Sequence, residues 1–595
     1  MRLQQKINQL FSKSEITKCI LLFFGLLLMG VFEVIGVSAI VPFIAVVVSP
    51  EIIFENNYLF QVYSFLNFKN STDFLLFLGV FLISTILVSN LYQGAMIWFI
   101  TYFSQMMNYR LSVRLLELYL SQPYDFFLTR NSSDLTQTIL IEVGRATSGV
   151  IMQSLQGLSK LMIVIYLIAL LIYVNPMIAF SAALFLGGIY SIIYTFFKKK
   201  LNLNGIQQST AQFSIFKAIN EVMSGIKDVK LKGSEQEFTN RFSLPAKNVA
   251  TIISQKVLIA TLPKYFLEVV AFGGITAIII SLISIREGSN SSIFPIISLY
   301  VMIGYRLLPA FQQIYTSFAE IRFNLPAFDN LAVEFSKSKS IKKSLINQAS
   351  ISFRDKLELN KISFEYEGAQ TTVLNELDLT IAHNSTVGLI GATGSGKTTL
   401  IDIVLGLLVP DSGKITVDGV EINTKNKFGW QKKIGYVPQS IYLTDDTILS
   451  NIAFAVPFDE IKMEQVVQAA KMANLDSFIK TLPDQYETFV GERGLRLSGG
   501  QKQRIGIARA LYHDPSILIL DEATSSLDGI TEEVIIEAIN NLSHKKTIIM
   551  IAHRLSTVKD CDIIHLMDSG KVIASGTFDY LMDNNEQFRK MAKNS

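Results

Sequence analysis

Long stretches without a charged residue constrain this chain more than any other feature of its sequence. No Lys, Arg, Asp or Glu occurs from Phe74 to Tyr109 or from Leu161 to Phe197, and Glu33 is the only one between Lys18 and Glu51. A membrane-spanning helix needs about 20 predominantly apolar residues. Much of the first half of the chain is therefore expected to lie in lipid as helices.

The charge is unevenly distributed along the 595 residues. Residues 1–340 hold 44 charged side chains (about 13%), and residues 341–595 hold 59 (about 23%). Soluble domains average about 25%, so only the second part has the composition of a soluble domain. We predict a membrane domain over 1–335, a linker over 336–350 and a second domain over 351–595.

The apolar runs divide into six predicted spans, because Asn175-Pro176 marks a tight turn in the middle of the third run. Basic residues concentrate in the segments that face the cytoplasm if both termini lie there, for example Lys198–Lys200, whereas the outer connections hold only Lys69 and Arg286. This bias predicts two cytoplasmic termini. The predicted spans are 17–48, 74–103, 146–174, 177–197, 257–285 and 291–322.

Two of the inner connections, 104–145 and 198–256, are long, charged and patterned as helices. We predict that they extend the spans into the cytoplasm and turn back near Gln122–Phe127 and Glu221–Gly225, where they would dock on a cytoplasmic domain. Solvated loops are the alternative, although loops of this length usually have a function.

The first outer loop runs from Ser49 to Thr72. In it, four apolar side chains fall on one helical face, which predicts a short helix at the outer membrane surface. A plain connecting loop is the alternative. The four residues are Leu59, Val62, Tyr63 and Leu66.

Several function classes are excluded by composition. The two cysteines, Cys19 and Cys561, lie far apart, and the five histidines are scattered, so neither a disulfide framework nor a metal centre is indicated. The net charge of +3 and the lack of a basic stripe give no sign of nucleic-acid binding.

The second half contains a phosphate-binding loop. Residues Gly391–Thr398 read GATGSGKT, follow the apolar strand Thr386–Ile390 and open a helix expected to run through Leu407. Glycines let backbone N–H groups surround phosphate at a helix N-terminus. Lys397 is expected to neutralise the β- and γ-phosphates of ATP, and the Thr398 hydroxyl to bind Mg²⁺.

A second apolar strand, Ser516–Leu520, ends in Asp521 and Glu522. Ligands bind at the carboxyl ends of buried parallel strands. Asp521 is therefore a candidate Mg²⁺ ligand, and Glu522 is the candidate base that polarises the attacking water. The alternative is that the two carboxylates only cap the following helix.

The segment Leu497–Gln501, LSGGQ, lies between these two sites, and in this context it identifies the second domain as similar to the ABC ATPases. Further segments resemble motifs of that family in the family's order: the adenine-stacking aromatic, the Q-loop, the exporter X-loop, the D-loop and the switch histidine. They are Tyr366, Gln439, Gly491–Gly494, Ser526–Asp528 and His553.

The resemblance implies an α-helical membrane domain of exporter type followed by an α/β P-loop ATPase. It also implies a half-transporter that pairs with a second copy of itself, with two ATP molecules sandwiched between the chains. Catalysis would fall to Glu522, His553 and Gln439, and Mg²⁺ binding to Thr398, Gln439 and Asp521. The implied nucleotide-binding residues are Tyr366, Gly391, Gly394, Ser395, Gly396, Lys397, Thr398, Thr399, Ser498, Gly499, Gly500, Gln501 and Asp528.

Charged residues inside predicted spans are candidate cargo contacts. The alternatives are structural ion pairs or side chains that reach the membrane surface. Lys264 and Glu268, four residues apart, are expected to share a helix face and to pair. The candidates are Glu33, Lys160, Lys264, Glu268 and Arg306.

Within the exporters, the chain resembles bacterial lipid-linked oligosaccharide flippases of the inner membrane. The resemblance rests on Glu33 with Val41–Phe43, on Leu262–Glu268 and on Tyr305–Pro309, together with the outer-loop helix. It implies movement of a polyprenyl-pyrophosphate glycan to the outer leaflet, with Lys264 and Arg306 facing the pyrophosphate. A general lipid or amphipathic-drug exporter, and an ATP-gated channel or sensor, are the alternatives.

Overall fold

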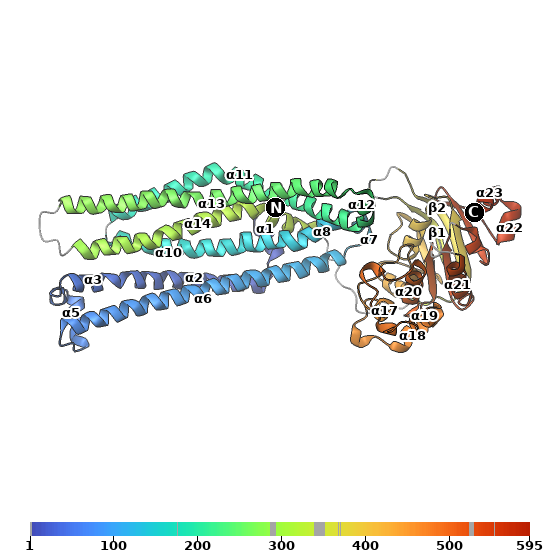
Figure 1. Cartoon of the computed structure of the whole chain (residues 1–595), viewed down its shortest axis with the longest axis horizontal. Coiled ribbons are helices and arrows are strands. Elements are labelled where there is room, and N and C mark those ends of the chain that lie inside the picture. Colours follow the sequence, from blue (N-terminus) through green and yellow to red (C-terminus); the bar gives the residue numbers. More distant parts are fainter. Residues whose placement is uncertain are drawn as a thin grey trace. The chain divides into compact units, whose positions relative to one another are not determined.

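The computed structural model describes residues 3–174, 176–285, 293–337, 351–366, 368, 371–522, 529–552 and 554–594. These residues form two compact units, a helical unit and an α/β unit (Figure 1). The helical unit comprises Met1–Gln122 and Thr129–Ser340, and the α/β unit comprises Pro123–Leu128 and Ile341–Ser595. Each unit is described separately below.

The helical unit is built from long helices joined by short turns. Two stretches of π-helix, Thr138–Glu142 and Thr147–Met152, flank the short helix α9. The α-helices are α1 (Leu3–Leu10), α2 (Lys13–Ser38), α3 (Ile40–Val48), α4 (Ile52–Glu55), α5 (Asn57–Phe65), α6 (Ser71–Leu120), α8 (Ser132–Gln137), α9 (Val143–Ala146), α10 (Gln153–Val174), α11 (Pro176–Ser224), α12 (Ile226–Lys232), α13 (Glu235–Ile285) and α14 (Ile293–Lys337).

The predicted spans fall within these helices. In the described part of the chain, three helical stretches are long and apolar enough to cross a membrane: Lys13–Val48, Ser71–Leu120 and Ser132–Val174. The other three predicted spans, 177–197, 257–285 and 291–322, are not among these stretches and overlap α11, α13 and α14, with residues 291 and 292 outside the described residues. The count of six spans therefore stays a prediction. Asn175 also lies outside, but α10 ends just before it and α11 begins just after it.

The predicted cytoplasmic extensions are helical. Helix α6 continues from its apolar part through Leu120, and α11 continues through Ser224. The chain then turns at the two predicted places, since α7 (Tyr124–Thr129) follows α6, and α12 begins at Ile226. The interpretation of these segments as loose loops is wrong.

The outer loop also forms the predicted helix, as α4 and α5. However, its four apolar residues do not share one environment. Leu59 and Tyr63 pack against a cluster that contains the fully buried Phe74, whereas Val62 and Leu66 are exposed. The prediction of a helix is confirmed, and its position at the outer membrane surface stays a prediction.

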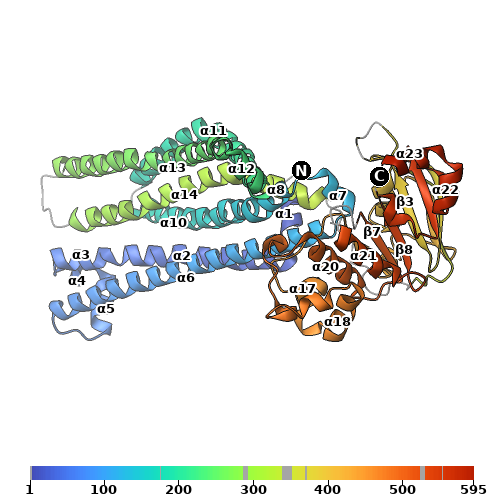
Figure 2. The same cartoon turned by 45° about the vertical axis from the view of Figure 1, so that its right-hand side comes forward.

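The long helices of the helical unit pack in two groups. Helices α2, α3 and α6 lie side by side, and α10, α11, α13 and α14 form the second group (Figures 1 and 2). Helix α10 also packs on α2, so the two groups share a core around the fully buried Leu26 and Leu167. Burial of such apolar side chains between helices fixes their mutual positions.

The α/β unit contains two sheets. A four-stranded antiparallel sheet has the order β2-β1-β4-β5, and a six-stranded sheet has the order β10-β9-β3-β8-β7-β6, parallel except for β10. The strands are β1 (Lys356–Phe364), β2 (Leu374–Ala382), β3 (Thr386–Gly391), β4 (Ser412–Val417), β5 (Val420–Glu421), β6 (Ile434–Val437), β7 (Ile517–Asp521), β8 (Thr547–Ile551), β9 (Ile563–Asp568) and β10 (Lys571–Gly576).

Strands β3, β7 and β8 are buried at every position, as expected for parallel strands covered on both faces. Helices cover the sheets and form a helical region between β6 and β7. The helices are α15 (Lys397–Val404), α16 (Lys427–Gln431), α17 (Ile448–Ile452), α18 (Met463–Met472), α19 (Asp476–Ile479), α20 (Gly499–Leu511), α21 (Gly529–Asn540), α22 (Phe578–Asn584) and α23 (Glu586–Asn594).

The predicted strands and helices of this unit are found within one or two residues, with one exception. Helix α15, expected to run through Leu407, ends at Val404. Gly406 follows with a positive φ of +67°, a backbone conformation that glycine adopts readily and that ends a helix.

Candidate functional site

The phosphate-binding loop connects β3 to α15. Gly394 and Gly396 have φ of +83° and +96°, a region that only glycine adopts without strain. A Cβ on Gly391 would come within 2.2 Å of the carbonyl oxygen of Met567 on β9. These glycines are therefore required by the path of the loop, which turns tightly at the carboxyl edge of the parallel sheet.

Lys397 is the first residue of α15, and its side chain turns back over the loop. Its Nζ donates to the carbonyl oxygens of Gly391 (2.8 Å) and Ala392 (3.0 Å) and to Oγ of Ser395 (3.4 Å). Burial lowers the pKa of Lys397, while the nearby carboxylates at the end of β7 oppose this effect. The buried ammonium group of Lys397 thus lies against the backbone of the loop.

The neighbouring threonines of the loop face opposite ways. Thr398 is exposed and Thr399 is buried. The Thr399 hydroxyl lies 3.0 Å from the hydroxyl of Tyr366, the predicted adenine-stacking residue. The Tyr366 ring meets Phe364 edge to face at a centroid distance of 5.0 Å. The aromatic side chain is thus held beside the loop from two directions.

Asp521 lies at the carboxyl end of β7, two strands away from the loop in the sheet. Its Oδ2 accepts a hydrogen bond of 3.3 Å from the Tyr436 hydroxyl on β6. Burial and then repulsion from Asp521 raise the pKa of Asp402 on α15 to about 6. Sequence reasoning missed both Tyr436 and Asp402.

Glu522 follows directly and has a positive φ of +49°. This conformation is strained for a residue other than glycine and concentrates at functional sites. Gln439 Nε2 donates to Glu522 Oε2 at 2.6 Å. The structure therefore brings together two of the three predicted catalytic side chains, one from the loop after β6 and one from the end of β7.

Ser498 precedes α20 and caps it. Its Oγ accepts from the backbone N–H of Gln501 at 3.3 Å, and Oε1 of Gln501 accepts from the Ser498 N–H at 2.9 Å. This reciprocal pair is a capping box. Capping α20 is thus a structural role for Ser498 and Gln501. Gly499 and Gly500 are the first two residues of the helix. Any role toward nucleotide is additional to this.

Two predicted site residues, Asp528 and His553, lie outside the described residues, as do Ser526 and Leu527 of the same motif and most of the predicted linker.

The described side chains and backbone fit a magnesium–nucleotide complex. A loop of glycine N–H groups at a helix N-terminus and a buried ammonium group suit phosphates. An exposed hydroxyl and a carboxylate, on Thr398 and Asp521, are oxygen donors of the kind Mg²⁺ prefers.

Comparison with known proteins gives the family. Residues 374–525 match the family described as "ABC transporter", and residues 16–306 match "ABC transporter transmembrane region". The chain is 31% identical over 471 residues to the heterocyst differentiation ATP-binding protein HepA of Nostoc sp., covering 77% of this chain and 74% of that protein. The chain belongs to the ABC transporter family. It is an exporter-type member and an ATPase coupled to transport.

Other relatives agree with this membership. The transporter is 28% identical over 505 residues to the ATP-dependent lipid A-core flippase of Shewanella oneidensis, covering 83% of this chain and 81% of that protein. A solved bacterial Atm1-family ABC exporter with ATP bound has the same fold, with a TM-score of 0.76 at 21% identity, covering 94% of this chain and 98% of that chain.

The charged residues predicted inside the spans form two groups in the transporter. Glu33, 2% exposed, lies 3.1 Å from Nε of Arg306. It also accepts hydrogen bonds from Ser89 and Gln93 on α6, two partners that no pattern or spacing in the sequence selects. Lys160 on α10 interacts electrostatically with both Glu33 and Arg306.

The second group is the predicted pair on α13. Lys264 Nζ lies 3.6 Å from Glu268 Oε1, with the two side chains 50% and 40% exposed. The Lys264 ammonium also lies 5.9 Å from the ring centroid of Tyr265. The expected pairing of Lys264 and Glu268 is confirmed.

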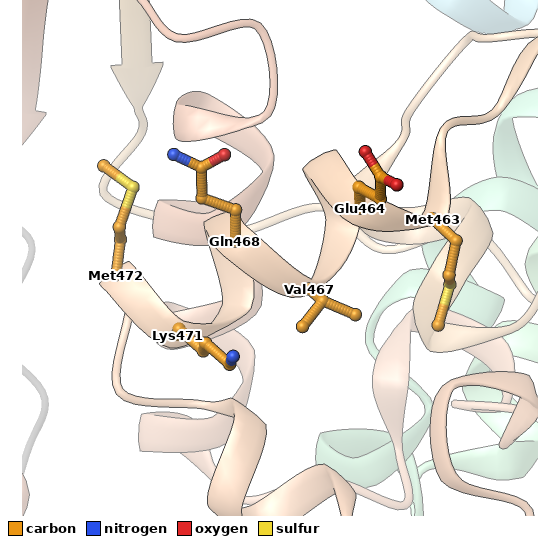
Figure 3. Close-up of a pocket in the computed structure, with 6 residues that line it drawn as sticks. All are labelled: Met463, Glu464, Val467, Gln468, Lys471 and Met472. Atoms are coloured by element: carbon orange, nitrogen blue, oxygen red, sulfur yellow. The ribbon is translucent and has the colours of Figure 1, made fainter.

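A shallow hollow on the α/β unit lies elsewhere. It is lined only by side chains of α18, shown in Figure 3, and includes none of the P-loop residues and neither Asp521 nor Glu522. The hollow therefore has no part in the candidate ATP site. Its lining residues are Met463, Glu464, Val467, Gln468, Lys471 and Met472.

Proposed function

We propose that this ABC transporter is a flippase that uses ATP hydrolysis to move a lipid-linked oligosaccharide, a polyprenyl-pyrophosphate glycan, to the outer leaflet of the bacterial inner membrane. Both termini and the ATPase domain would be cytoplasmic, and the membrane domain would have six spans. Two observations support a lipid cargo: the likeness to a lipid A-core flippase and the charges among the membrane helices.

The charge balance around Glu33 carries the proposal. One carboxylate there faces two cations, Arg306 and Lys160. Glu33 is paired with Arg306 and accepts hydrogen bonds from Ser89 and Gln93, so under this proposal Lys160 would supply the positive charge for an anionic head group. A pyrophosphate attracts such cations strongly, whereas an uncharged lipid gains nothing from them. Lys160 and the exposed Lys264 are therefore the proposed contacts of the anionic head group.

The ATP site would be completed by a second copy of the chain. Lys397 and the P-loop N–H groups would hold the phosphates, Tyr366 the adenine, and Thr398, Gln439 and Asp521 the Mg²⁺, which supplies charge neutralisation. Glu522 would polarise the attacking water, assisted by His553. Ser498, Gly500 and Asp528 of the second copy would close over the nucleotide. A homodimer would thus hold two competent sites.

The decisive experiment uses purified protein in phospholipid vesicles with a fluorescent polyprenyl-pyrophosphate glycan. We expect ATP to move the glycan across the bilayer, and the Glu522→Gln variant to abolish the movement. Lys160→Met and Lys264→Ala should each reduce transport severely. The matched control is Lys590→Ala, because Lys590 lies on α23 and its pair with Glu586 is at the surface.

Two results would redirect the proposal. If Lys264→Ala and Lys160→Met leave transport unchanged, and a neutral lipid is moved as well, the protein is a general lipid or amphipathic-drug exporter. If the glycan stimulates ATP hydrolysis but nothing crosses the membrane, the ATPase instead drives a channel or a sensor.

A further inference from the structure

Helix α13 contains a proline within its apolar part. Pro263 is buried, and the helix continues through it from Glu235 to Ile285. Proline has no N–H, so the carbonyl oxygen four residues earlier, that of Ile259, loses its helical donor. The proline ring also pushes the carbonyls of this turn outward. In an apolar environment an unpaired carbonyl costs considerable free energy.

Helix α14 supplies a donor to the Ile259 carbonyl and another to the carbonyl next to it. The Tyr315 hydroxyl donates to the Ile259 carbonyl oxygen at 2.9 Å. Gln312 Nε2 donates to the carbonyl oxygen of the next residue, Ala260, at 2.9 Å. Ile259, Ala260 and Tyr315 are all buried. The two side-chain donors, three residues apart on one face of α14, thus match the two carbonyls beside the proline.

The orientation of Gln312 is fixed by a third helix. The hydroxyl of Tyr190 on α11 donates to Gln312 Oε1 at 2.8 Å. Only the amide nitrogen can then face α13, where it also donates to Thr316 Oγ1 at 3.1 Å. The rings of Tyr190 and Tyr315 pack at a centroid distance of 5.2 Å. The turn of α13 at Pro263 is therefore joined to α11 and α14 by a buried polar network.

The segment of α13 directly after Pro263 carries the Lys264–Glu268 pair. Before the proline, α13 is anchored by Ile259 and Ala260, whereas Lys264 and Glu268 are half-exposed. The course of α13 beyond Pro263 decides where these charges lie. A network that holds the turn at Pro263 therefore fixes the position of both charges.

We propose that Tyr315 and Gln312 are positioning residues: by donating to the Ile259 carbonyl freed by Pro263 and to the neighbouring Ala260 carbonyl, they set the course of α13 beyond residue 263 and so place Lys264 and Glu268. The role depends on the geometry of α13 and α14 and not on the identity of the cargo.

A double-mutant cycle tests the assignment of the donors. Tyr315→Phe removes the hydroxyl and keeps the ring, leaving the Ile259 carbonyl unpaired, and should lower the melting temperature of the detergent-purified transporter by about 3 °C. Pro263→Ala restores a backbone N–H to that carbonyl. In the Pro263→Ala background, Tyr315→Phe should therefore lower the melting temperature by less than about 1 °C.

Tyr194→Phe is the matched control for these measurements. Tyr194 lies on α11, as Tyr190 does, and its ring packs on Phe318 of α14 at a centroid distance of 5.8 Å. Its substitution should have the same small effect in both backgrounds. If Tyr315→Phe lowers the melting temperature equally with and without Pro263, the hydroxyl does not compensate for the proline, and the proposal is overturned.

Spin labelling tests positioning directly and does not require the Pro263→Ala protein to fold. Labels at Val257→Cys and Phe266→Cys report on α13 before and after Pro263, where the native side chains are 47% and 61% exposed. Cys19→Ser removes the only other accessible cysteine, since Cys561 is buried. Tyr315→Phe and Gln312→Leu should change the spectrum at 266 and leave that at 257 unchanged. Equal spectra at 266 in wild type and both variants would refute the positioning role.

Discussion

The buried polar side chains of the two units have different kinds of partner. In the helical unit, Arg145 pairs with Glu142 at 2.9 Å and also donates to Ser209, Asn324 and the carbonyl oxygen of Gly205. These partners come from α11, α14 and the π-helical segment next to α9. Every bond of this network lies within the protein, so its groups are committed to holding helices together.

In the ATP site the bonds are of another kind. Lys397 donates to carbonyls of its own loop, and Gln439 donates to Glu522. These are groups that phosphates, Mg²⁺ and water would engage in turn, under the proposed function. Burial alone therefore does not mark function: substitution of the groups that hold helices together should cost stability, whereas substitution of groups in the ATP site should cost turnover.

The largest effect is expected for Glu522→Gln. Loss of a general base reduces rates by 10²–10⁴-fold, so ATP hydrolysis should fall about 1000-fold, while ATP binding and the melting temperature stay close to wild type. Hydrolysis by purified protein and nucleotide binding are the measurements. Glu358→Gln, which breaks the pair of Glu358 with Lys356 on β1, is the control and should retain activity. Normal turnover by Glu522→Gln would exclude the assigned base.

Arg145→Met tests the buried network of hydrogen bonds around Arg145. Its side chain is 9% exposed and that of Glu142 is 3% exposed, so the variant leaves a buried carboxylate without its partner. Breaking a buried pair in this way costs about 3–5 kcal/mol, which thermal unfolding in detergent should show as a large loss of stability.

The control for Arg145→Met is another Arg–Glu pair of the same unit. Arg241 lies 2.9 Å from Glu237, but the two side chains are 56% and 60% exposed. Surface pairs contribute little because water already solvates both charges. Arg241→Met should therefore unfold like wild type. Equal losses in the two variants would mean that the Arg145 network is no more stabilising than a surface pair.

A third test uses a buried group of the α/β unit that has no part in the ATP site. Burial lowers the pKa of His565 on β9 to about 4, and Nδ1 lies 2.7 Å from the Ser575 hydroxyl on β10. The unfolded chain takes up a proton near pH 6.5 but the folded one does not. Stability is therefore full above pH 6.5 and should fall by about 2 kcal/mol between pH 7 and pH 5.

Thermal unfolding across this pH range is the measurement, with His565→Asn as the test variant. It should remove most of the decline, although its stability at pH 7 falls. His513→Asn replaces an exposed histidine and should leave the decline unchanged. A decline of the same size in His565→Asn would mean that another group is responsible.

The ATP site was predictable from the sequence where local chemistry dictates local structure. Glycines at Gly394 and Gly396 imply a loop with positive φ, and the apolar run before Asp521 implies a buried strand; both are found. The charged, helix-like pattern of the inner connections likewise predicted the helical extensions in α6 and α11. These features depend on neighbours in sequence and need no knowledge of the tertiary fold.

Partners from distant segments could not be predicted. Glu33 and Arg306 are far apart in the chain, and neither pattern nor spacing indicates that they pair. Nor did any signal select Arg145, whose partners come from three other segments. Pro263 did carry a usable signal, since its missing N–H implies a donor for Ile259, but the sequence does not say that Tyr315 provides it.

The smallest effect separates the two roles of Ser498. As the cap of α20 it accepts a hydrogen bond from the Gln501 N–H, so Ser498→Ala should cost about 1 kcal/mol of stability. Thr577 caps α22 in the same way, by accepting from the Tyr580 N–H at 3.3 Å. Thr577→Ala should cost a similar amount of stability in thermal unfolding but leave ATP hydrolysis unchanged, because Thr577 lies outside the ATP site.

If Ser498 acts only as a cap, both variants will hydrolyse ATP equally well. If it also closes over the nucleotide of a second copy, Ser498→Ala alone will lose turnover at matched stability.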